Sequence, residues 1–508
     1  MIVVTPEQMK YLEAEADRNG NSYENLMELA GKKLSEKITE MLCNDKQKKV
    51  LFLCGNGNNA GDCFVAARYL ENTDICCTVA MLCGTPKTDI SLLNFNRMRN
   101  TEIISEHREI MNALRTEKFS LAADGVFGTG FRGELPEKIC EVFAACADLK
   151  ILAVDVPSGG NCKTGAVSIG TLKADETITF AFSKFGMTQY PLKSFCGKVC
   201  VADIGIHQKF TENLDCIINI TDNETIKGII PQKVPDSHKG NYGRLLTVCG
   251  SETMPGACIM SLESALKSGV GLVQAAVPES LIQVIATRLP EVMFLPLTTD
   301  SNGCITFDNF DKIIRHSKNA TSVLIGCGIG VTEQTKTLVK NLIANINCPV
   351  ILDADGINCI ADSIDIIKQS MSDIIITPHP AEMGRLCNVP TGEIQSDRLQ
   401  AALEFAKENN VTVVLKGAGT VIAGNNRVNV NTNGNPGMAK GGSGDVLAGI
   451  IASLKAQGIS AYDSAVLGTF IHGLAGDEAA SEMSMQSMTA TDIIKKLSMV
   501  FKTCTNGL

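Results

Sequence analysis

Apolar runs of strand length alternate with helix-length segments along two stretches of the chain, separated by a polar segment near residues 208–234. The runs are continuously apolar, which is typical of parallel strands covered by helices on both faces. We therefore predict two α/β domains, residues 1–213 and 234–508, joined by a linker at 214–233. The expected strands are KVLFLCG, ICCTVAML, FSLAADG, KILAVDVPSG, ETITFAF and KVCVADIGI in the first stretch, and LLTVCG, GLVQAAVP, SVLIGCGIG, PVILDADG, DIIITPHP, VTVVLKGAGTVIAG and RVNVNT in the second.

The chain is expected to begin with a helix. Thr5, Pro6 and Gln8 fit a capping box with proline at the first helical position. No basic region followed by an apolar core stands at this end, and no apolar run approaches the ~18 residues of a membrane span. We expect a cytoplasmic protein.

Composition narrows the classes of partner. The chain has 508 residues, a net charge of −9 and no long basic run, so we expect no nucleic-acid or membrane partner. Its 20 cysteines include no CxxC pair and no second pair that would complete a zinc site. Many stand inside apolar runs, where cysteine behaves as a small hydrophobic residue, so we expect reduced core cysteines.

The segment NPGMAKGGSGDVLAG, residues 435–449, combines glycines with an aspartate and opens an apolar helical pattern. Glycines turn backbone N–H groups inward, and a helix start adds its positive end, which suits a phosphate. No Lys-Ser or Lys-Thr pair follows the last glycine, so the segment is not a P-loop. Asp445 stands there instead, and we interpret it as a base that takes a proton from a hydroxyl. Taken alone, a capped Gly-rich connection explains the segment equally well.

Polar groups follow three strands of the first stretch, at residues 55–62, 124 and 155–158. Ligands of parallel sheets bind at the carboxyl ends of strands, and clustered hard oxygens suit a hard cation or acid/base chemistry. Ordinary turn chemistry is the alternative for each group alone. The first loop is not a dinucleotide fingerprint, because its last glycine comes one residue late and the next strand ends without an acid.

The segments TPEQMKYLE, NLMELAG, LFLCGNGNNAGDCFVAARYL, DGVFGTGFRG and DVPSG, in this order, resemble the NAD(P)H-hydrate epimerases of the YjeF N-terminal family. The resemblance implies a Rossmann-like three-layer αβα fold that interconverts the R and S forms of a hydrated nicotinamide ring. It implies Asp155 as the acid/base and a K⁺ ion held by Asn59, Asp124 and Ser158. The role of Lys184 stays open. The implied substrate contacts are Asn58, Asn59, Ala60, Gly61, Asp62, Gly128, Thr129, Gly130, Phe131, Arg132, Gly133, Glu134 and Asp155.

In the second stretch, HKGNYG, GCGIG, LDADGIN, TPHPAEM, LKGAGT and GMAKGGSGDVLAG are similar, in order, to the ADP-dependent NAD(P)H-hydrate dehydratases of the ribokinase-like group. Cys327 stands where proline is more usual, and Lys440, where threonine is common, could reach a phosphate. The resemblance implies contacts to the hydrated dinucleotide by Ala257, Gly328, His379 and Asp445, and to the nucleotide by Lys416, Gly417, Ala418, Gly419, Thr420 and Gly444.

The two resemblances together imply a nicotinamide nucleotide repair enzyme. One domain would epimerise NAD(P)H hydrate, and the other would dehydrate the S form at the expense of ADP, giving AMP and phosphate. We expect K⁺ in the first domain, Mg²⁺ in the second, ADP as co-substrate, and a homo-oligomer. Two alternatives are a ribokinase-like small-molecule kinase, and a first domain that only binds a nucleotide or protein.

Overall fold

The structure is a computed structural model that describes residues 1–506. It divides into two compact units, one of Ile2–Ile218 and one of Met1 with Asn219–Leu508. Both are α/β units, which confirms the predicted fold class. No helix among the described residues is long and apolar enough to span a membrane.

The first unit is built on a seven-stranded sheet in the order β4-β3-β2-β5-β6-β7-β9, with every neighbouring pair parallel. The strand order reverses between β2 and β5, so the ends of these two strands form a switch point, where parallel sheets bind ligands. The strands are β1 (Ile2–Val4), β2 (Lys49–Cys54), β3 (Cys76–Met81), β4 (Glu102–Ile104), β5 (Leu121–Gly125), β6 (Lys150–Val154), β7 (Glu176–Phe180), β8 (Ser183–Lys184) and β9 (Lys198–Ala202), with β1 paired to β8.

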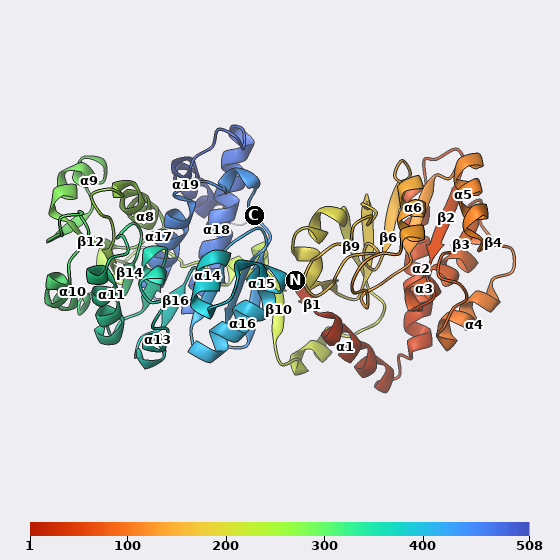
Figure 1. The fold of residues 1–508 in the computed structure, drawn as a ribbon, viewed down its shortest axis with the longest axis horizontal. Helices are drawn as coiled ribbons and strands as arrows, with labels where there is room; N and C mark the ends of the chain where they lie inside the picture. Colours follow the sequence, from red (N-terminus) through yellow and green to blue (C-terminus); the bar gives the residue numbers. More distant parts are fainter. Residues whose placement is uncertain (507–508) are drawn as a thin grey trace. The chain divides into compact units, whose positions relative to one another are not determined.

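Strand β2 shows how the first unit forms three layers (Figure 1). Its residues Val50 and Phe52 pack into one core with helices α1–α3, while Leu51 and Leu53 pack into another with α5 and α6. Both faces of the sheet are therefore apolar, as the continuous apolar runs predict. The helices are α1 (Pro6–Arg18), α2 (Tyr23–Met41), α3 (Asn58–Leu70), α4 (Asp89–Arg97), α5 (His107–Thr116) and α6 (Glu137–Ala145).

The expectation that the chain begins with a helix is wrong, because one short strand precedes the first helix. Strand β1 precedes helix α1, and three apolar residues before Thr5 are too few to give a pattern of their own. The predicted capping box is present, because the Thr5 side chain accepts from the Gln8 backbone and the Gln8 side chain accepts from the Thr5 N–H. The predicted linker contains β10 (Ile217–Ile220) and helix α7 (Asn223–Lys227).

The second unit has strands in the order β13-β12-β11-β14-β15-β16-β17-β18-β19. They are parallel as far as β17, and β17, β18 and β19 are antiparallel, with a switch point between β11 and β14. The strands are β11 (Arg244–Val248), β12 (Leu272–Pro278), β13 (Met293–Leu297), β14 (Ser322–Ile325), β15 (Val350–Leu352), β16 (Ile374–Ile376), β17 (Thr412–Leu415), β18 (Thr420–Gly424) and β19 (Arg427–Asn431).

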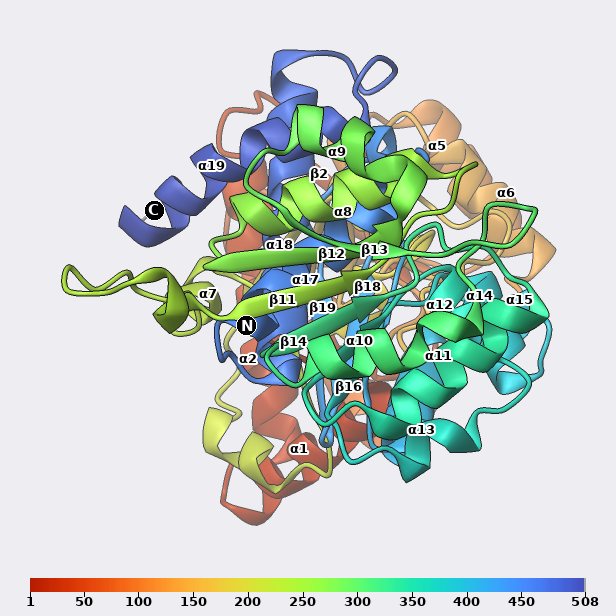
Figure 2. The same ribbon diagram turned by 90° about the vertical axis from the view of Figure 1, so that its left-hand side faces the viewer.

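Helices cover both faces of this sheet, with α8 on one side of β11 and β12 and with α10 and α11 on the other (Figure 2). Helix α17 packs against α8 and is buried over most of its length, because VLAGIIASL is apolar all round. The helices are α8 (Pro255–Lys267), α9 (Ile282–Arg288), α10 (Phe310–Ser317), α11 (Glu333–Asn345), α12 (Asp355–Asn358), α13 (Asp365–Gln369), α14 (Pro380–Cys387), α15 (Thr391–Ser396), α16 (Arg398–Asn409), α17 (Ser443–Ala456), α18 (Ala461–Glu482) and α19 (Ala490–Asn506).

Candidate active sites

The three predicted cation ligands of the first unit converge at its switch point. The Ser158 hydroxyl donates to Asp124 Oδ1 over 2.6 Å, and the Ser158 N–H donates to Asp124 Oδ2 over 2.8 Å. Asn59 Nδ2 donates to the Val154 carbonyl over 3.0 Å. A Cβ at Gly128 would lie 3.4 Å from the Asn59 Cβ, so the loops after β2, β5 and β6 meet here.

Asp124 is a carboxylate that folding has removed completely from water. Burial raises the pKa of Asp124 to about 6, although hydrogen bonds from Ser158 and Val126 oppose the rise. Among the described residues no cationic side chain forms an ion pair with it. A bound cation would offset this burial, and the Ser158 hydroxyl and the Phe127 carbonyl, whose oxygens are 3.2 Å apart, would be further oxygen ligands beside Asp124.

Asp155 stands just after β6 and is held by Lys184. The Lys184 ammonium forms a buried ion pair with Asp155 Oδ1 and donates to Thr179 Oγ1 over 2.8 Å. Thr179 Oγ1 in turn donates to Asp155 Oδ1 over 3.1 Å. Asp155 has a φ of 66°, a backbone conformation that a non-glycine residue adopts only where its surroundings fix it. The structure thus gives Lys184 a place as the partner of Asp155.

The charge of Asp155 raises the pKa of two further carboxyl groups, those of Glu13 and Asp62. Burial raises the pKa of Glu13 to about 7, and the negative charge of Asp155 adds to the rise. Burial also raises the pKa of Asp62 far above its usual range, with Asp155 and Glu13 contributing. Sequence analysis missed Glu13, which lies on α1 one turn after the buried Met9, on the side that turns inward.

The predicted loop 128–134 contributes less directly. Phe131 is buried against Phe127, with ring centroids 5.1 Å apart. Arg132 is exposed and donates to the Phe131 carbonyl over 2.8 Å, and Glu134 accepts from Ser168 over 2.7 Å. Neither charged side chain contacts Asp155 in the described residues. At the other loop, Asn58 Oδ1 accepts from Thr88 over 2.6 Å.

In the second unit, side chains from four strand ends meet around Asp353. Lys416 Nζ donates to Asp353 Oδ1 over 2.7 Å, and Thr377 Oγ1 donates to the same oxygen over 2.6 Å. The Cys327 Sγ lies 3.9 Å from Asp353 Oδ2. A Cβ at Gly444 would lie 3.4 Å from Lys416 Nζ and 3.8 Å from Asp353 Oδ2, so the glycine turn borders this group.

Asp445 lies in the first turn of α17 beside these residues. Burial raises the pKa of Asp445 to about 6, and the Asp353 charge adds to the rise, while Cys327 and Lys416 oppose it. A carboxyl group with this pKa is ionised at neutral pH and still basic enough to accept a proton.

Ala257 and Gly328, two predicted contacts of the hydrated dinucleotide, are close to each other, since a Cβ at Gly328 would lie 2.9 Å from the Ala257 Cβ.

The predicted nucleotide turn, Lys416–Thr420, rests on a buried arginine. Arg398 Nη2 donates to the Leu415 carbonyl over 3.0 Å and to the Lys416 carbonyl over 3.3 Å. A Cβ at Gly417 would lie 2.6 Å from Arg398 Nη1, and the φ of 147° at this position also favours glycine. Burial lowers the pKa of Arg398 to about 10. Sequence analysis missed Arg398, because its position under the turn depends on how α16 packs.

His379 and Lys440 have structural partners. His379 is the N-cap of α14, where its Nδ1 accepts from the backbone of Ala381 over 3.1 Å and of Glu382 over 3.2 Å. Burial and the charge of Lys416 lower the pKa of His379, so the ring is neutral at neutral pH. Lys440 donates to the carbonyls of Gln486 and Met488, which holds the glycine turn to that loop.

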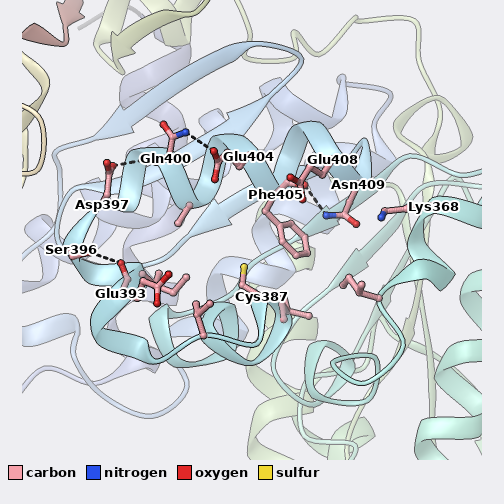
Figure 3. A pocket seen from close by; sticks show the side chains of 15 residues that line it. Lys368, Cys387, Glu393, Ser396, Asp397, Gln400, Glu404, Phe405, Glu408 and Asn409 are labelled. Carbon is pink, nitrogen blue, oxygen red and sulfur yellow. Dashed lines mark hydrogen bonds between the residues drawn. The ribbon is translucent and has the colours of Figure 1, made fainter. Parts of the chain in front are cut away.

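A cavity of about 430 Å³ lies apart from the polar cluster around Asp353. It is lined by the end of α14, by α15 and by one face of α16, with Cys387 and Phe405 directed into the space between them (Figure 3). A second cavity, of about 380 Å³, is lined by Arg244, Gln274 and His316. Neither contains a predicted site residue.

Comparison with known proteins addresses both units. The NAD(P)H-hydrate dehydratase family profile matches residues 245–499, and the profile of the YjeF-related protein N-terminus matches residues 23–186. The bifunctional NAD(P)H-hydrate repair enzyme of Moorella thermoacetica is 34% identical over 488 residues, which cover 94% of this chain and 92% of that protein. This chain belongs to the family of bifunctional NAD(P)H-hydrate repair enzymes.

Two solved structures are similar to about half of this chain. A hypothetical protein from Streptococcus mutans is 27% identical, with a TM-score of 0.50, and the match covers 56% of this chain and 99% of that one. An ADP/ATP-dependent NAD(P)H-hydrate dehydratase from Bacillus subtilis is 28% identical, with a TM-score of 0.48, covering 56% of this chain and 98% of that one.

Membership of the repair enzyme family confirms the interpretation of the chain as an isomerase and a hydro-lyase in one polypeptide. It favours repair over a small-molecule kinase with a non-catalytic first domain. The roles of individual residues remain predictions.

Proposed function

We propose that residues 1–213 epimerise the hydrate and residues 234–508 dehydrate it, with residues 214–233 as the linker. The observation that carries the proposal is Asp445, a half-buried carboxyl group with a pKa of about 6 placed beside a lysine and a glycine turn. Such a group is suited to take a proton from a hydroxyl at neutral pH, next to donors suited to a phosphoryl group.

In the dehydratase step, Asp445 takes the proton of the ring hydroxyl, whose oxygen attacks the terminal phosphorus of ADP and releases AMP. Lys416 and the N–H groups of the turn at Gly444 stabilise the charge of the transferring phosphoryl group. The ring then expels phosphate and loses a ring proton, which restores the reduced nicotinamide. Lys416–Thr420 hold the nucleotide, and Ala257, Gly328 and His379 contact the hydrated dinucleotide. Mg²⁺ bound with ADP would offset phosphate charge near Asp353.

In the epimerase step, Asp155 exchanges protons with the hydrated ring while Lys184 fixes its orientation. Substrate contacts come from Asn58–Asp62 and from residues 128–134. Asn59, Asp124 and Ser158 would hold K⁺, and the fit rests on the fully buried Asp124 carboxyl and the oxygens around it. The ion would supply a positive charge that keeps Asp124 ionised and the three loops together.

The test follows the near-ultraviolet absorbance of reduced nicotinamide while a mixture of R and S NADPH hydrate is incubated with enzyme, Mg²⁺ and ADP. We expect complete recovery for the wild type, recovery of the S fraction alone for Asp155→Ala, and no recovery for Asp445→Ala. AMP should form in step with NADPH. Full activity of either variant would contradict the role assigned to that residue.

We further propose a homo-oligomer that acts in the cytoplasm on small-molecule substrates, without nucleic-acid or membrane partners. The absence of long basic runs supports the part of the proposal that excludes nucleic acid, and the family's small-molecule substrates support the substrate class. Light scattering measures the oligomeric state, and cell fractionation measures the location.

A further inference from the structure

Cys327 gives the second site a donor set that phosphoryl transfer does not require. One ligand atom each from Cys327, Asp353 and Asp445 lie within 4.8 Å of one another. Cys327 and Asp353 are buried, and Asp445 is partly exposed.

The spacing of these atoms is close to that of a metal centre. In a tetrahedral zinc site, bond lengths of ~2.3 Å to sulfur and ~2.0 Å to oxygen place the ligand atoms about 3.5 Å apart. The Cys327 Sγ lies 3.9 Å from Asp353 Oδ2, which already approaches this separation. Three protein ligands would leave a fourth position open for water or a phosphate oxygen.

Asp353 is oriented for such a role by residues outside the set. Its Oδ1 accepts from both Lys416 and Thr377, so its Oδ2 is the oxygen that faces Cys327. Lys416 is the one cationic side chain in ion-pair contact with Asp353 among the described residues. Lys416 offsets the charge of Asp353, and no ion pair among the described residues offsets that of Asp445, so a divalent cation could neutralise it.

Sulfur decides which cation fits. Mg²⁺ prefers oxygen ligands, whereas a thiolate selects thiophilic ions such as Zn²⁺ or Cd²⁺. A thiol ligand gives up its proton when it coordinates such a cation. The buried thiols of Cys249 and Cys258, 2.9 Å apart, also lie near Cys327 and add soft, polarisable surroundings.

We propose that Cys327, Asp353 and Asp445 form a binding site for a thiophilic divalent cation of the zinc and cadmium class. An ion there occupies the carboxylate of Asp445, so it inhibits the dehydratase and leaves the epimerase active. The inhibition rests on the proposed function of Asp445, whereas the binding does not.

The binding test titrates Cd²⁺ into the reduced, full-length protein and records the ultraviolet cadmium–thiolate charge-transfer band. We expect the wild type to form one more cadmium–thiolate bond per chain than Cys327→Ser. Zn²⁺ affinity, measured against a chromophoric chelator, should fall at least about 100-fold in that variant. Cys304→Ser, which removes another buried thiol of the same unit, should titrate like the wild type. Equal titration of wild type and Cys327→Ser would overturn the site.

Circular dichroism first checks that the variants fold, and Cys327→Ala replaces Cys327→Ser if the latter does not. The activity test adds Zn²⁺ at saturating Mg²⁺ and should stop dehydration by the wild type while Cys327→Ser keeps its own rate. If the protein lacks dehydratase activity but the cadmium band requires Cys327, the proposed function fails and the site stands. If the dehydratase is active but the cadmium band is the same in wild type and Cys327→Ser, the metal site is refuted and the proposed function stands.

Discussion

Replacing Lys184 by methionine should destabilise the first unit more than any surface substitution in it. The Lys184 side chain is 1% exposed and its partner Asp155 is 13% exposed, so water can solvate little of either charge if the other is removed. Removing one partner of a buried pair leaves the other charge uncompensated, at a cost of about 3–5 kcal/mol. Thr179 and the Phe180 carbonyl lose their donor at the same time.

Chemical denaturation, followed separately for the two activities, measures this cost. We expect Lys184→Met to lose epimerase activity at much lower denaturant than the wild type, while the dehydratase midpoint stays unchanged. Lys33→Met is the matched control, because Lys33 pairs with Glu36 on the exposed surface of α2 and its loss should not shift the midpoint measurably.

A second substitution separates charge from packing. In Asp155→Asn with Lys184→Met the buried charge is gone, so part of the lost stability should return although epimerase activity does not. A Lys184→Met midpoint equal to that of the Lys33 control would refute the reasoning. So would a double variant whose loss of stability exceeds the summed losses of the two single variants.

Three further predictions concern the second unit. Because ionised Asp445 is the proposed base and its pKa is about 6, kcat/KM for dehydration should rise with pH through about 6 and then level off, and a rate that falls over this range would contradict the role. Gly444→Ala places a methyl group 3.4 Å from Lys416 Nζ and should lower kcat by about 10–100-fold, whereas Gly441→Ala, whose Cβ meets nothing within 4 Å, should not. Arg398→Met leaves buried carbonyls without a donor, at about 1–3 kcal/mol, and should raise the KM for ADP roughly tenfold in steady-state assays, an effect that would be absent if the turn were self-supporting.

The sequence predicts the α/β units because apolar runs report strands buried on both faces. It also predicts which loops carry polar groups, since the ends of parallel strands share one edge of a sheet. In the structure, Asn59, Asp124 and Ser158 meet in this way, as do Asp353, Thr377 and Lys416.

Residues that enter a site from helices escape this reasoning. Glu13 and Arg398 reach their clusters because α1 and α16 pack at particular angles, and no local pattern encodes an angle between helices. Lys184 is visible in the sequence, yet its pairing with Asp155 depends on the turn that follows β7. Short elements such as β1 and β4 carry too few residues to show a period.

Every residue named in the two polar clusters comes from its own unit, Glu13 to Lys184 in one and Ala257 to Asp445 in the other. The groups that we assign to each reaction are therefore supplied by one unit. What the shared polypeptide secures is dosage: each translation event delivers one isomerase for each hydro-lyase.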